Sequence, residues 1–165
     1  MEEQEQHQMV IDLAREQKYE VKGIKSFRGN EGYGFNATLY RKGKKIAFVM
    51  DSAQGGQHDW EWVDRKLRFE ETKLICLVKN IPECETEFDF TMGVDIDMFI
   101  SMLVGEKEEY DSFKRKCKTK TLYTLKSDQP NQYWIMNHIY DERVKAHLQK
   151  KHGSELVEII NERYI

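Results

Sequence analysis

The alternation of side chains between Tyr19 and Val63 is the feature that most constrains the fold of this 165-residue chain. Residues 35–40 read Phe-Asn-Ala-Thr-Leu-Tyr and residues 46–50 read Ile-Ala-Phe-Val-Met, so both runs have the two-residue period of a β-strand. The polar segment 41–45 between them contains a glycine and predicts a hairpin turn. With further strands expected at 19–27 and 59–63, the sequence predicts an antiparallel meander of four strands.

A glycine-dense turn from Arg28 to Asn36 interrupts this pattern and allows two interpretations. It is either the bend of a hairpin or a loop whose backbone N–H groups hold a phosphate, with Arg28 supplying positive charge. The order G-x-x-G-x-G lacks the Gly-Lys-Ser/Thr of a Walker A loop and opens a strand at Phe35 rather than a helix. We favour the hairpin and keep the turn as a candidate ligand-binding loop. Its candidate residues are Arg28, Gly29, Asn30, Gly32, Tyr33 and Gly34.

The rest of the chain is mainly helical in pattern, with one more hairpin. Apolar residues spaced by three and four predict helices, and Thr119–Lys126 with Tyr133–Met136 predicts a second hairpin after an acidic connector at Glu83–Asp89. Near the end, Asp141 and Ser154 are each expected to cap a helix. The expected helices cover residues 2–17, 65–80, 95–117, 141–153 and 154–164. The sequence therefore predicts an α+β fold, a single domain over residues 1–165 with helices covering one face of the sheet.

Charge and cysteine content narrow the class of protein. The net charge of −3 gives no overall positive field for nucleic acid. Three cysteines without a C-x-x-C pair are typical of reduced intracellular thiols, and an acidic start differs from a secretory signal. Since no run approaches the roughly 20 apolar residues of a membrane span, we expect a soluble cytoplasmic protein without membrane contact.

A second polar loop follows the third predicted strand and contains His58 between Asp51 and Asp59. These side chains could ligate a metal or act as an acid–base pair, but a metal site needs three or four ligands. We favour a solvated loop and predict no metal, no cofactor and no catalytic residue. Trp60 and Trp62 share the strand face of His58 and form either a buried stripe or a stacking platform, and we favour the stripe.

A basic patch lies at the end of the long predicted helix and precedes Tyr123. Positive charge beside an aromatic ring suits phosphates, whereas lysines at a helix end also favour the helix dipole and remain solvated. We favour the solvated helix end, and nucleic-acid binding is not predicted because no known binding motif accompanies the patch. The patch residues are Lys114, Arg115, Lys116, Lys118 and Lys120.

Two segments of the sequence resemble segments of other proteins. Residues 24–51, IKSFRGNEGYGFNATLYRKGKKIAFVMD, and residues 118–164, with KTKTLYTLKSD and YDERVKAHLQKKHG, resemble small uncharacterised proteins of bacteriophages and related mobile elements. The resemblance implies a phage accessory protein in the bacterial host cytoplasm, for which interference with host immunity is a familiar role. It transfers no catalytic residue.

Three functional hypotheses follow. The leading one is a non-enzymatic phage-type binding protein that acts on a host protein, as an inhibitor of a bacterial defence system. The alternative is a binder, or sponge, of a nucleotide or another phosphorylated small molecule, held by Arg28, Gly29–Gly34 and the basic patch. The third is an enzyme that uses Asp51, His58 and Asp59 as metal or acid–base groups. The sequence makes no prediction of oligomeric state.

Overall fold

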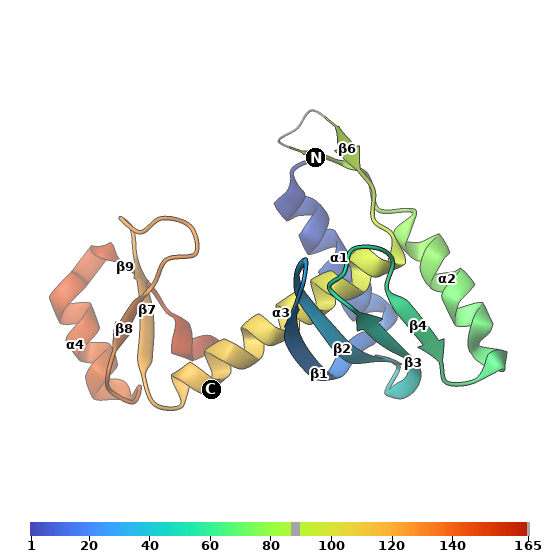
Figure 1. The fold of residues 1–165 in the computed structure, drawn as a ribbon. Helices are drawn as coiled ribbons and strands as arrows, with labels where there is room; N and C mark the ends of the chain where they lie inside the picture. The colour runs from blue at the N-terminus through green and yellow to red at the C-terminus, as the bar shows by residue number, and fades with distance from the viewer. Residues whose placement is uncertain (87–89, 165) are drawn as a thin grey trace. The chain divides into compact units, whose positions relative to one another are not determined.

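The computed structural model describes residues 1–86 and 90–164. It confirms the α+β class, with helices and antiparallel sheets in the same chain (Figure 1). The chain divides into two compact units, Met1–Lys107 and Glu108–Ile165, and each is described by itself. That they form one domain stays a prediction. The predicted acidic connector falls partly on residues 87–89, which lie outside the described residues.

The first unit is built on the predicted meander. Its four strands pair in the order β1-β2-β3-β4, each antiparallel to the next. Asn30 and Glu31 form the bend between β1 and β2, because Gly29 pairs with Gly32 across it. The glycine-dense turn is therefore a hairpin, as the alternation favoured. The strands are β1(Tyr19–Gly29), β2(Gly32–Arg41), β3(Lys44–Asp51) and β4(Asp59–Trp62).

Three helices cover one face of this sheet. They are α1(Glu3–Gln17), α2(Arg68–Val78) and the first part of α3(Ile96–Cys117). Figure 1 shows α1 and α3 passing behind the sheet, with α2 beside β4. Alternate sheet residues such as Leu39 and Val49 face this layer and pack with Leu74, Phe99 and Ile100, which are buried. This apolar layer provides most of the stabilisation of the unit.

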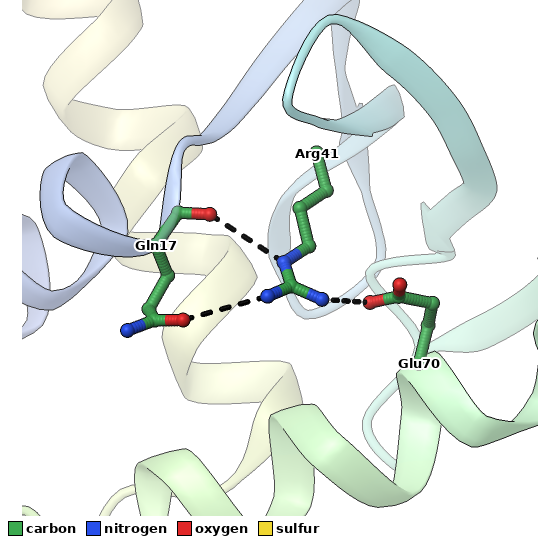
Figure 2. Close-up of polar contacts among 3 residues, drawn as sticks. All are labelled: Gln17, Arg41 and Glu70. Atoms are coloured by element: carbon green, nitrogen blue, oxygen red, sulfur yellow. Dashed lines mark hydrogen bonds and ion pairs between the residues drawn. The ribbon is translucent and has the colours of Figure 1, made fainter.

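A buried ion pair joins the sheet to α2 (Figure 2). Arg41 donates to the Glu70 carboxylate at 2.7 Å, and both side chains are almost completely buried. The same guanidinium donates to the backbone oxygen of Gln17 and to its side-chain oxygen, each at 3.4 Å. The guanidinium also lies over the ring of Tyr19, 5.3 Å from its centroid. Because these partners come from α1, β1 and α2, the arginine joins three elements to its own strand, β2.

A short pair of strands, β5(Cys84–Glu85) and β6(Thr91–Met92), was not expected from the sequence. The side chain of Gln6 holds this segment against α1, because its amide donates to the backbone oxygens of Pro82 and Met92. Such pairing of two residues leaves no detectable period in a sequence.

The second unit is a small sheet with a helix. The strands β7(Thr121–Leu125) and β8(Trp134–Met136) form the predicted second hairpin, and α4(Glu142–His152) begins with Asp141 as its cap. The helix expected after Ser154 is wrong: β9(Leu156–Ile159) pairs there with β7, followed by a 3₁₀ turn. Its Val and Ile residues suit a strand, and cross-strand pairing outweighs the local cap signal.

The buried side chain of Asn161 completes the second unit. Its oxygen accepts the Leu122 N–H at 2.7 Å, and its amide donates to the backbone oxygens of Cys117 and Lys120. This single side chain, two positions after the end of β9, therefore forms hydrogen bonds with backbone groups at the C-terminal end of α3 and at the start of β7.

Candidate functional site

The first unit contains a pocket of about 500 Å³ between β4, α2 and the start of α3. Its wall combines one indole, several aliphatic side chains and a group of charged side chains. Apolar side chains combined with convergent polar groups are typical of ligand sites in proteins. The lining residues are Gln57, His58, Trp60, Glu71, Ile75, Val78, Lys79, Val94, Asp95, Ile96 and Asp97.

Asp97, in the first turn of α3, organises one side of the pocket. One carboxylate oxygen accepts the indole N–H of Trp60 at 2.7 Å, and the other accepts the backbone N–H of His58 at 2.9 Å. Two donors on one ionised carboxylate are charge-assisted hydrogen bonds, which are stronger than neutral ones. The indole and the end of the polar loop are thus held in a fixed position before any ligand binds.

The ring of His58 contacts α3 at a second point. Its Nε2 lies 2.8 Å from the hydroxyl oxygen of Ser101, and Phe35 packs edge-on at 5.4 Å between ring centroids. A serine beside a histidine is the geometry of a nucleophile and its base. However, Asp97 contacts the backbone of His58 and not its ring, and Ser101 does not line the pocket. Among the described residues His58 Nδ1 has no hydrogen-bond partner, so the orienting third group of a catalytic triad is not seen there.

Trp60 and Trp62 form a stacked pair on the inner face of β4. Their rings are nearly parallel, with centroids 5.5 Å apart and an interplanar angle of 13°. Both are half-buried and pack against the core of the first unit. Neither ring is fully buried as a buried stripe would be, and Trp60 but not Trp62 lines the pocket.

The charged groups of the pocket are mostly negative. Glu71, Asp95 and Asp97 are carboxylates, and Lys79 supplies one ammonium group. One Asp95 oxygen accepts the Met98 N–H and so caps α3. An excess of carboxylates beside an indole favours a cationic ligand group, because the indole face also attracts cations.

The two glycine-containing loops pack against each other, which gives the glycines a structural role. The N–H of Glu31 in the hairpin bend donates to the backbone oxygen of Ala53 at 2.9 Å. A Cβ at Gly29 would lie 2.8 Å from that same oxygen, and a Cβ at Gly34 would collide with the backbone oxygen of Asp51. Only glycine permits this approach. The hairpin bend thereby supports the loop that leads to His58.

The predicted site residues consequently fall into separate places. His58 and Trp60 line the pocket, whereas Arg28, Asn30 and Tyr33 are exposed on the hairpin. Of the proposed acid–base group, the Asp51 carboxylate accepts the Ala53 N–H, and Asp59 lies on the opposite face of the sheet from the pocket. These two aspartates and His58 are not brought together.

The basic patch belongs to the last turns of α3 and to the short connection before β7, in the second unit. Lys116 donates to the Tyr133 hydroxyl at 2.7 Å and lies over the rings of Phe113 and Tyr133. Lys114 lies over the ring of Tyr110. Arg115 and Lys118 are exposed at the C-terminal end of the helix, where positive charge interacts favourably with the helix dipole.

Within residues 1–86 and 90–164, no group of three or more histidine, cysteine, aspartate or glutamate side chains could hold a metal ion. In the same part of the chain, no helix has the length and apolar character needed to cross a bilayer.

Comparison with known proteins adds no relative. No family model, no curated protein and no solved structure matches this chain.

Sequence reasoning found one wall of the pocket and missed the other. The two-residue period placed His58 and Trp60 on one face, but Glu71, Asp97 and Ser101 were not selected. Asp97 was visible only as an acidic residue at a helix start, which is explained by the helix dipole alone. Its contact with Trp60 spans 37 positions in the chain, a separation at which local periodicity carries no information.

Proposed function

We propose that this protein is a non-enzymatic, phage-type binding protein that acts on a host protein in the bacterial cytoplasm, as an inhibitor of a defence system. The observation that carries the proposal is the pocket beside Trp60, whose walls are fixed by hydrogen bonds within the protein itself. A preformed site of this kind loses little entropy on binding.

The charges of the pocket indicate what part of a host protein it accepts. Glu71 and Asp95 line the pocket together with Trp60, and no ion pair of Glu71 occurs within the described residues. A lysine or arginine side chain would gain a carboxylate partner and a contact with the indole face. The proposed partner segment is therefore basic at the point where it enters the pocket.

The alternative, a binder of nucleotides or other phosphorylated molecules, is not favoured at this pocket. Three carboxylates and one ammonium group would repel a phosphate. The backbone N–H of Glu31 in the hairpin bend is already bonded to Ala53. The hypothesis stays a prediction for the exposed Arg28 and for the lysines of the second unit.

Capture of host proteins by tagged protein tests the proposal. We expect one host protein to be retained by the unaltered chain and by Glu109→Lys, which reverses an exposed charge on α3 in the second unit. Glu71→Lys should lose the same host protein, because an ammonium group then faces the basic segment. A parallel thermal-shift panel of nucleotides should leave the melting temperature unchanged. Retention by Glu71→Lys, or stabilisation by nucleotides, would contradict the proposal.

A further inference from the structure

The outer face of the β1–β4 sheet is a second surface, distinct from the pocket. The helices α1, α2 and α3 pack on the inner face, and the core residues of the unit lie on that side. The outer face carries a shallow groove of about 610 Å³. Within the described residues of the first unit, no helix covers it.

Two rows of the outer face are ordered in charge from one edge of the sheet to the other, whereas the neighbouring row carries Glu20 on β1 and Lys45 on β3. The strand register places Lys25, Asn36, Met50 and Asp59 in one row across the four strands. The next row contains Lys22, Thr38, Phe48 and Glu61. Both rows therefore begin with a lysine on β1 and end with a carboxylate on β4.

Two apolar side chains lie between these charged edges. Phe48 is 42% exposed and Met50 is 38% exposed, although both are on an inner strand of the sheet. Asn36 and Thr38 separate them from the lysines. An exposed apolar patch rimmed by charges is typical of a surface that binds another protein.

The spacing of the edges fits a helix. Three strand spacings separate β1 from β4, which is about 14 Å, and an α-helix with its side chains is about 10–12 Å wide. A helix also satisfies its own backbone hydrogen bonds, whereas an extended chain lying flat on the face would leave its polar groups unpaired. The helix is therefore the better occupant.

We propose that the outer face of this sheet binds an amphipathic helix of a partner protein. Its apolar stripe lies on Phe48 and Met50, an acidic flank faces Lys22 and Lys25, and a basic flank faces Asp59 and Glu61. The charge order of the face selects a helix with flanks of opposite sign over one with two flanks of the same sign.

Designed peptides test this directly. The probe is a fluorescein-labelled 18-residue helical peptide with a leucine stripe, glutamates on one flank and lysines on the other. Two control peptides keep the leucine stripe but carry lysines on both flanks or glutamates on both flanks. Fluorescence anisotropy should show that the unaltered protein binds the mixed peptide more tightly than either control.

Protein variants then separate the apolar and charged contributions. The double variant Phe48→Thr with Met50→Thr should lower the affinity for the mixed peptide by more than about tenfold. Phe69→Ala, which removes an exposed ring from α2, should leave this affinity unchanged. Lys25→Glu should lower the affinity for the mixed peptide by about three- to fivefold and raise the affinity for the peptide with lysines on both flanks. Reversing both rows, with Lys22→Glu and Lys25→Glu on β1 and Asp59→Lys and Glu61→Lys on β4, should restore binding of the mixed peptide, because a helix turned end to end presents its flanks in the opposite order.

Three results would overturn the inference. The first is failure of the mixed peptide to bind. The second is tightest binding of the two-lysine-flank peptide to the unaltered protein, which would indicate attraction by net charge alone. The third is a dimer in sedimentation that Phe48→Thr with Met50→Thr dissociates, since a second copy would then occupy the face. Circular dichroism checks the folding of each variant, and if the double threonine variant unfolds, the Lys25 series decides alone.

Discussion

The carboxylate of Asp97 accepts the indole N–H of Trp60 at 2.7 Å, which fixes one wall of the pocket from the start of α3. The second oxygen of the same carboxylate holds the backbone N–H of His58. A single side chain thus connects the helix to the strand and to the loop before it. The shape of the proposed binding site depends on this connection.

Asp97→Asn should lower the free energy of unfolding by about 2 kcal/mol, because the amide can accept at only one of the two donors. Urea denaturation measures the change, and the indole resonance of Trp60 in an NMR spectrum reports the lost hydrogen bond. Asp12→Asn on the exposed side of α1 is the control and should change stability by less than about 0.5 kcal/mol. Equal stability of both variants would show that Asp97 does not organise the pocket.

Gly34→Ala should destabilise the first unit by about 1–3 kcal/mol, because its Cβ would collide with the backbone oxygen of Asp51. Gly105→Ala is the matched control. Nothing lies within 4 Å of a Cβ at Gly105 inside α3, and alanine there should stabilise the helix by about 0.5–1 kcal/mol. Thermal unfolding of the two variants should therefore shift in opposite directions. A Gly34→Ala variant of unchanged stability would contradict the packing role of the glycine loop.

Glu70→Gln should lower the free energy of unfolding by about 3 kcal/mol or more, because Arg41 then keeps a buried charge without its carboxylate. The neighbouring Glu71→Gln should change it by less than about 0.5 kcal/mol. Replacing Arg41 by Met and Glu70 by Leu together should cost less than Glu70→Gln alone. A double variant that lowers the free energy of unfolding as much as Glu70→Gln, or more, would contradict this account of the pair.

The phenol of Tyr19 should ionise late in an alkaline titration. Burial raises its pKa to about 12, Arg41 opposes this, and Glu70 adds to it. The unfolded chain loses this proton near its ordinary pKa of 10.0, so the folded state binds more protons in the window between. The associated stability is complete below pH 10 and is lost as the pH rises toward 12.

Absorbance at 295 nm against pH measures this titration. Tyr140, whose pKa burial and a hydrogen bond to Glu162 also raise to about 12, should titrate in the same late step. Tyr19→Phe and Tyr140→Phe should each remove part of the step. If Tyr19→Phe keeps the whole late absorbance step, the phenol of Tyr19 ionises together with the exposed tyrosines, which would contradict the prediction.

Local signals in the sequence predicted most of the fold. The alternation at 35–40 and 46–50 and the turn glycines specified the meander, since each neighbouring strand is also the next in the chain. The segment after Ser154 shows where local signals fail. Its cap residue and apolar spacing suited a helix, but pairing with β7, some thirty positions earlier, makes it a strand.

The candidate site was less predictable than the fold. His58 and Trp60 were selected because they share one strand face. Asp97 and Ser101 reach them across 37 and 43 positions, through the packing of α3 against the sheet. Such contacts depend on how helices are placed on the sheet, which a single sequence does not encode in any short pattern.

Site-specific photo-crosslinking in bacteria tests the central claim most directly, that the pocket of the first unit binds a host protein. A benzophenone amino acid at position 79 replaces a pocket-lining lysine, and the same group at position 73 replaces a lysine on α2 outside the pocket. We predict one crosslinked host protein from position 79 and none from position 73. Crosslinks of equal yield from both positions, or from position 73 alone, would contradict the claim.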